Sequence, residues 1–185
     1  EVSGTDLLAI QVDDVNATYP LRIDPTFSDA NWVSMNPGIP GASNTVNACV
    51  SDGSGNLYIG GGFSLVGNVL ANHIAKWDGS SWSALGTGVD TTARALAVSG
   101  ADLYAGGGFT TAGAANTNYI AKWDGSSWSA LDVGVTSSVY AVVVNGTDLY
   151  VGGDFIMAGG VSANYIAKWD GRSWSALGRG MDGSV

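Results

Sequence analysis

The chain has 185 residues, of which 45% are apolar and only 12% are charged, so it can bury a substantial core in one or two domains. Seven Lys and Arg against 16 Asp and Glu give a net charge of −9, which argues against nucleic acid or an anionic membrane surface as a partner. No apolar run approaches the roughly 20 residues of a membrane-spanning helix, so membrane insertion is not expected.

Residues 1–27 differ in character from the rest of the chain. Two apolar stretches, 6–13 and 19–25, flank a turn at 14–17 and predict a β-hairpin. Because an isolated hairpin is barely stable in water, we expect this one to be the C-terminal hairpin of an upstream β domain. Residues 28–45, which are rich in Pro and Gly, are predicted to be a linker and the lead-in strand of a preceding repeat unit.

A repeat of 46 residues organises the remainder of the chain. The sequence Ala-Lys-Trp-Asp-Gly begins at Ala75 and returns at Ala121 and Ala167. One Tyr, one Phe and two Trp per repeat keep the same spacing, and we expect them to hold the fold by packing between sheets. They are Tyr58, Tyr104 and Tyr150; Phe63, Phe109 and Phe155; Trp77, Trp123 and Trp169; and Trp82, Trp128 and Trp174.

Each repeat is predicted to contain four short strands. In the middle repeat, residues 94–98 form an apolar strand with both faces buried, and 103–106 return after a turn. A loop at 109–118 leads to a strand at 119–123, and 128–131 follow an Asp-Gly hairpin turn. Every acidic residue except Glu1 is Asp, which favours turns over helices.

Four strands in about 45 residues match one blade of a β-propeller. We therefore predict an all-β fold with blades at 46–91, 92–137 and 138–183 and the start of a further blade at 184–185; the alternative is a β-trefoil, which closes at three units. Blades are preferred because Trp32-Val33-Ser34-Met35 matches the fourth strand of an earlier unit, and 181–185 match the approach to a new one. We expect a piece of a larger ring, or a ring completed by other copies.

The motif Leu-Tyr-x-Gly-Gly-x-Phe, followed by Tyr-Ile-Ala-Lys-Trp-Asp-Gly-x-Ser-Trp-Ser-Ala-Leu, resembles the Kelch-like propeller repeats of large bacterial surface and secreted proteins. The resemblance covers about residues 46–185, and His73 departs from it by replacing the Tyr found at 119 and 165. It implies a propeller of the galactose-oxidase-like superfamily, but without the several histidines that the copper site of that enzyme needs. Such propellers include enzymes, glycan binders, adhesins and scaffolds, so the resemblance does not select a function.

The chain offers few residues for catalysis. His73 is the only imidazole and is interpreted as a polar-tipped aromatic in the Tyr position. Cys49 falls where Leu96 and Val142 stand in the other repeats, and is interpreted as a buried small hydrophobe. One His and one Cys cannot supply a repeated nucleophile and base, so we expect no enzyme, no catalytic residue and no cofactor.

Two sets of polar residues invite a metal interpretation. Asp52, Ser54 and Asn56 have the alternate spacing of a calcium loop, although the remaining EF-hand ligands are absent. The other set is interpreted as turn residues, because each member precedes a Gly at a hairpin tip; it comprises Asp78, Asp124 and Asp170.

Two further sets of repeated residues, three Trp and three Lys, are candidates for exposed positions on the surface. If exposed, Trp82, Trp128 and Trp174 are candidates for stacking on sugar rings, against the alternative of core packing. The three lysines alternate with aromatic residues on a strand, which favours a solvated side chain with a cation–π contact; they are Lys76, Lys122 and Lys168.

The function expected from these observations is a non-enzymatic module, extracellular or on the cell surface, with a structural or adhesive role. Its expected partners are other blades of the same protein or further copies of it, with surface proteins or glycans as additional candidates. The first alternative is a glycan-binding, lectin-like propeller. The second is a fragment of a secreted enzyme whose active residues lie outside this chain.

Overall fold

The computed structural model describes residues 2–3, 7–8 and 41–185. The chain divides into two compact units, Glu1–Pro37 and Gly38–Val185. Within Glu1–Pro37, β1 (Val2–Ser3) pairs antiparallel with β2 (Leu7–Leu8). The second predicted strand of the N-terminal hairpin, at 19–25, and residues 32–35, predicted to match the fourth strand of an earlier unit, lie outside the described residues.

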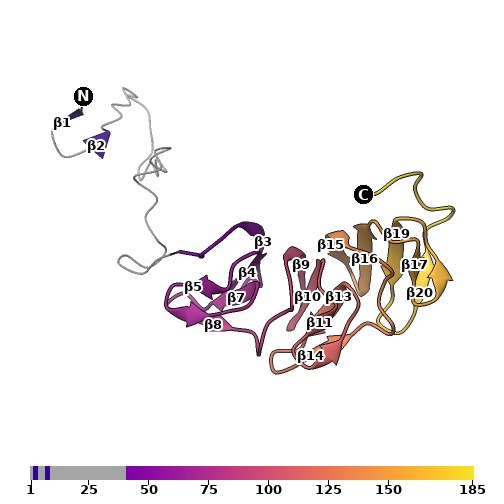
Figure 1. Ribbon diagram of the computed structural model, residues 1–185, viewed down its shortest axis with the longest axis horizontal. Coiled ribbons are helices and arrows are strands. Elements are labelled where there is room, and N and C mark those ends of the chain that lie inside the picture. The colour runs from indigo at the N-terminus through magenta and orange to yellow at the C-terminus, as the bar shows by residue number, and fades with distance from the viewer. Residues whose placement is uncertain (1, 4–6, 9–40) are drawn as a thin grey trace. The chain divides into compact units, whose positions relative to one another are not determined.

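Residues 41–185 form three repeat units, each built around a four-stranded antiparallel sheet whose strands follow one another in chain order (Figure 1). The first sheet contains β3 (Val46–Ser51), β4 (Leu57–Gly61), β7 (Ile74–Trp77) and β8 (Trp82–Ala84). The second contains β9 (Ala93–Ser99), β10 (Asp102–Gly107), β13 (Ile120–Trp123) and β14 (Trp128–Ala130). The third contains β15 (Val139–Asn145), β16 (Asp148–Gly153), β19 (Ile166–Trp169) and β20 (Trp174–Ala176).

No helix occurs in the part of the chain that the structure describes. The predicted all-β fold of repeated four-stranded sheets is confirmed, and it is consistent with blades. The register repeats from unit to unit, since the two Trp of each unit face each other across the third and fourth strands. These cross-strand pairs are Trp77 with Trp82, Trp123 with Trp128, and Trp169 with Trp174. Such pairing of large aromatic side chains stabilises a sheet at its outer edge.

The segment between the second and third strands was predicted as a loop, and that prediction was incomplete. It holds a small two-stranded sheet in every unit: β5 (Leu65–Val66) with β6 (Val69–Leu70), β11 (Thr111–Ala112) with β12 (Ala115–Asn116), and β17 (Met157–Ala158) with β18 (Val161–Ser162). Each strand has only two residues, which is too short for the alternation of apolar and polar residues that reveals a strand.

The three units follow one another in series. The first strand of the middle unit, β9, packs against the first strands of both neighbours, β3 and β15 (Figure 1). No comparable packing joins β3 to β15 among the described strands. A β-trefoil would close its three units on one another, so this arrangement argues against that alternative.

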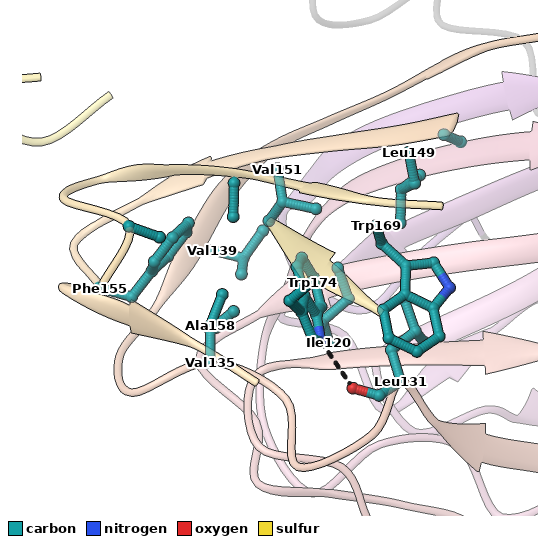
Figure 2. Close-up of a cluster of buried hydrophobic side chains, with 13 residues drawn as sticks. Ile120, Leu131, Val135, Val139, Leu149, Val151, Phe155, Ala158, Trp169 and Trp174 are labelled. Carbon is teal, nitrogen blue, oxygen red and sulfur yellow. Dashed lines mark hydrogen bonds between the residues drawn. The ribbon is translucent and has the colours of Figure 1, made fainter. Parts of the chain in front are cut away.

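The core lies between the sheets. One cluster combines Ile74 and Leu85 of the first unit with Leu103 and Phe109 of the second. A second cluster combines residues of the second and third units and is drawn in Figure 2. Burial of apolar faces between neighbouring sheets is what an individual thin sheet needs, because it cannot exclude water from both of its faces alone.

Candidate functional site

The interfaces between successive repeat units, here called seams, are built twice from equivalent residues. The preceding unit contributes an Ile, a Leu and a Val to each seam, all at most 4% exposed. They are Ile74, Leu85 and Val89 in the first seam, and Ile120, Leu131 and Val135 in the second. The following unit contributes Leu103 or Leu149 and Phe109 or Phe155, all at most 1% exposed. The repeated Phe is fully buried in both seams, and Phe63 is fully buried in the first unit as well.

The fourth-strand Trp ties each unit to the one before it. Trp128 Nε1 donates to the carbonyl oxygen of Leu85 at 2.8 Å. Trp174 Nε1 donates to that of Leu131 at 2.9 Å, and Figure 2 draws this second bond. Their rings also lie against the third-strand Trp of their own unit, with centroids 5.3 and 5.4 Å apart. A buried Trp that also satisfies its N–H is a strong anchor.

The same geometry bears on the glycan hypothesis. Trp128 and Trp174 are only 8% and 6% exposed, so neither ring has an open face on which a sugar could stack. Trp82 is half-buried and pairs with Trp77 at 5.3 Å. Core packing therefore accounts for two of the three candidates.

The linker between units forms a second tie across each seam. Val89 and Val135 each make a single antiparallel bridge to the small sheet of the next unit, at Ala112 and Ala158. One residue before each bridge, a Gly carbonyl accepts a backbone N–H from that sheet at 2.8 or 2.9 Å. The linker thus extends the small two-stranded sheet by one further segment.

A side-chain oxygen on the linker caps the same small sheet in every unit. Asp90 accepts the N–H groups of Thr110 and Thr111, at 2.9 and 3.2 Å. Ser43 and Thr136 stand at the equivalent positions in the first and third units and accept the equivalent pairs of N–H groups. The residue type changes while the acceptor oxygen stays, which is why the sequence comparison of repeats missed this contact.

The first Gly of the doublets in the first and second units lies where the next unit packs closely. A Cβ on Gly60 would lie 3.0 Å from the Cβ of Ala93 in the next unit, and one on Gly106 would overlap the side chain of Val139. A larger residue at either position would force the sheets apart. The first Gly of the doublet is therefore required by the seam, whereas a Cβ on the second, such as Gly107, would collide with the backbone of its own unit at Thr92.

The stack has two outer faces, here called the N-face on the side of the first unit and the C-face on the side of the third. Several positions that are buried in seams are exposed on these faces, although Phe63, the equivalent of Phe109, is fully buried within the first unit. On the N-face, Val46 is 47% exposed and Cys49 is exposed; the equivalent residues of the third unit pack against Gly106. The predicted burial of Cys49 was wrong, because no described unit packs on this face. On the C-face, Val143 is 58% exposed, whereas its equivalent Ala97 is 7% exposed in a seam.

A polar cluster that is not repeated lies where the first strands of the second and third units meet. The guanidinium of Arg94 lies over the ring of Tyr140, 5.1 Å from its centroid. The hydroxyl of Tyr140 donates to the carboxylate of Asp154, and this bond raises the pKa of Tyr140. Sequence analysis did not find this cluster, because its residues are not repeated. The first unit has Asn47 where the second has Arg94 and the third has Tyr140, and Gly62 and Gly108 stand where the third unit has Asp154.

A cavity of about 360 Å³ opens at the seam between the second and third units. Its lining includes the side chains of Tyr119, Val133 and Met157. Val133 and Met157 are 60% and 38% exposed and replace Thr residues of the preceding seam. The cavity is large enough for a small ligand.

The hairpin-tip aspartates behave as turn residues. Asp78 Oδ1 accepts the backbone N–H groups of Ser80 and Ser81, both at 2.8 Å, and Asp124 and Asp170 repeat this arrangement. These N–H groups lower the pKa of all three carboxyls. The side chains are thus committed to closing the turn, as Asx turns do.

The candidate calcium loop is closed by its own hydrogen bonds. Asp52 accepts from the Asn56 side chain at 2.6 Å and from the Ser54 N–H at 2.8 Å. The bond from Asn56, followed by that from Ser54, lowers the pKa of Asp52. Within residues 2–3, 7–8 and 41–185, no group of three or more His, Cys, Asp or Glu side chains is arranged to hold a metal ion.

The repeated lysines make two different contacts. Lys76 lies over the ring of Tyr58 at 5.7 Å, which is the predicted cation–π contact. Lys122 and Lys168 instead form ion pairs with Asp102 and Asp148, at 3.2 and 3.0 Å. The difference arises because Asn56 stands in the first unit where the others have Asp.

His73 adopts the backbone of the Tyr it replaces. Its φ is 65°, and those of Tyr119 and Tyr165 are 71° and 69°, a left-handed conformation that non-Gly residues seldom adopt. Each of the three donates its N–H to the carbonyl of the Phe ten residues earlier, at 2.7 to 2.8 Å. His73 is thus a structural substitute for Tyr.

Comparison with known proteins leaves the function open. A scan against protein-family models gives no match, and a search of curated proteins finds no relative. Within the described residues, no helix has the length and apolar character needed to cross a membrane.

Proposed function

We propose that this chain is a non-enzymatic β-propeller module of the Kelch-like kind, with a structural or adhesive role outside the cell or on its surface. The observation that carries the proposal is how the repeated residues are used. Trp128 anchors its unit to the preceding one, Phe109 is fully buried in a seam, and Asp124 closes a turn. Residues used in this way build a rigid scaffold and leave no repeated group for chemistry.

The residues that differ between units also support a role in contact rather than catalysis. They concentrate at the start of the first strands and on the small two-stranded sheets, as Arg94, Tyr140 and Leu70 illustrate. Leu70, in the small sheet of the first unit, is 78% exposed, and Ile156, directly before the small sheet of the third unit, is 55% exposed. A rigid scaffold with a variable exposed edge suits binding to other macromolecules.

The location is tested on intact cells that produce the protein, with an antibody against residues 41–185. The proposal predicts that the antibody binds intact cells, or that the protein is found in the medium, and that external protease removes the cell-bound signal. Detection only after the cells are broken would contradict it. The adhesive role is tested with beads coated with the chain, which should bind cells or surface proteins above the level of beads coated with a heat-unfolded sample.

A further inference from the structure

We propose that the N-face of this chain binds the C-face of a second copy, head to tail, by the packing that joins the repeat units within one chain. The proposal concerns packing alone, so it can fail while the proposed role at the cell surface stands, and the reverse also holds. Interfaces of this kind use two different surfaces of the same molecule and lead to rings or to open chains of copies.

The N-face presents the residues that a following unit uses in a seam. Val46 is 47% exposed, whereas Ala93 and Val139, its equivalents, are fully buried against the preceding unit. Trp82 is half-buried, whereas its equivalent Trp128 is 8% exposed. The face therefore has the shape and chemistry of a surface that is covered elsewhere in the same molecule.

The C-face presents the residues that a preceding unit uses. Ile166 is half-buried, whereas Ile74 and Ile120 are fully buried in seams. The carbonyl of Leu177 accepts the N–H of Gly180 at 3.0 Å. The carbonyls of Leu85 and Leu131 accept an equivalent N–H and, in addition, a Trp Nε1–H from the next unit.

The match between the two faces follows from the repeat. The seam between the first and second units and the seam between the second and third are built from equivalent residues, with the same Trp–carbonyl bond in each. The C-face of one copy and the N-face of another present this set a third time. In the head-to-tail complex, Trp82 of one copy would donate to Leu177 of the other.

Binding of a second copy at the C-face requires the C-terminal segment of the chain to move. Val185 lies against Gly152 in the place that Val139 takes against Gly106. A second copy would bring its own Val46 to this position, so residues 181–185, all of them exposed, would be displaced. Weakening the contact of Val185 should therefore strengthen the association.

The proposal is tested by sedimentation velocity of the full chain over a wide range of concentration. We expect the mass to rise from one copy to two or more. Val46→Asp blocks the N-face and Val143→Asp blocks the C-face, and each should weaken association at least about tenfold, because a buried unpaired charge is costly. Leu70→Asp is the matched control, since Asn116 and Ser162 stay exposed at the same position in their units.

Mixing the two blocked variants gives the sharpest result. Val46→Asp retains its C-face and Val143→Asp retains its N-face, so the mixture should form a heterodimer although each variant alone is monomeric. Val185→Ser should shift the wild-type association to lower concentration. Circular dichroism melting establishes that all variants are folded. A wild-type chain that stays monomeric, or a mixture of blocked variants that does not associate, would overturn the proposal.

Discussion

The middle repeat unit and the two outer units have nearly the same sequence but different surroundings. Ala93, at the start of the middle unit, is fully buried, whereas Val46 at the same position in the first unit is 47% exposed. Ala97 is 7% exposed, whereas Val143 in the third unit is 58% exposed. The contrast shows that these side chains are buried by the neighbouring unit and not by their own sheet, so stability should be greatest where a unit has neighbours on both sides.

The largest expected effect comes from the Trp that anchors each unit. Trp128→Ala removes a buried ring and its hydrogen bond to Leu85, and should lower the free energy of unfolding by about 3–5 kcal/mol. Trp82→Ala removes the equivalent, half-buried ring from the N-face and should cost clearly less. Denaturant unfolding in dilute solution measures both. Equal losses would mean that the seam adds nothing to the packing of the Trp.

A second pair of variants compares the same Gly inside and outside a seam. A Cβ on Gly106 would collide with Val139, which is fully buried, so Gly106→Ala should cost about 1–3 kcal/mol. A Cβ on Gly152 would lie 2.9 Å from Val185, which is 42% exposed and free to move, so Gly152→Ala should cost less than about 0.5 kcal/mol. The same unfolding measurement applies, and a reversed order would contradict the assignment of the seams.

How much of this was predictable from the sequence depends on whether a residue is repeated. The spacing of Trp, Phe and Gly predicted the three four-stranded sheets, because identical positions in three units are expected to serve the same structural purpose. The small two-stranded sheets were missed because their strands are too short to show a period. The Arg94, Tyr140 and Asp154 cluster was missed because it is assembled across two units and occurs once.

The exposure of Cys49 shows a second limit. Its repeat equivalents, Leu96 and Val142, predicted a buried side chain, but Cys49 is exposed. The prediction assumed that every unit has a neighbour on the same side. Equivalent positions share a backbone conformation, and His73 bears this out, but burial depends on what packs against the unit.

The hairpin-tip aspartates should contribute to the pH dependence of stability equally in all three units, since each unit has the same turn. Backbone N–H groups lower the pKa of Asp78, Asp124 and Asp170 in the folded chain. A carboxyl with a lowered folded pKa stabilises the fold above its ordinary pKa of about 3.9 and loses this contribution as the pH falls below that value. The melting temperature of the wild type should therefore drop between about pH 5 and pH 2.

The triple variant Asp78→Asn, Asp124→Asn, Asp170→Asn separates this contribution from that of the other acidic groups. It keeps an acceptor oxygen in each turn but removes the titrating charge. Its melting temperature should be lower than that of the wild type at neutral pH and should fall less steeply in acid. Parallel curves for the two proteins would show that the turns do not contribute to the pH dependence.

The smallest expected effect concerns the lysine contacts. Lys122→Met breaks a surface ion pair with Asp102, whose two side chains are 35% and 33% exposed, and should lower the melting temperature by at most about 2–4 °C. Lys76 has no such ion pair and contacts Tyr58 instead, so Lys76→Met serves as the comparison. High salt should reduce the effect at Lys122 and leave that at Lys76 nearly unchanged. Equal salt dependence would contradict the two assignments.

Hydrogen exchange of the wild-type chain, followed strand by strand in dilute solution, tests most directly whether neighbouring units stabilise one another. If the seams provide the stability, the amides of β9 and β10 in the middle unit should exchange most slowly. Those of β3 and β4 in the first unit, and of β19 and β20 in the third, should exchange faster although the sheets have the same hydrogen-bond pattern. Equal protection in all three units, or slowest exchange in an outer unit, would contradict the account.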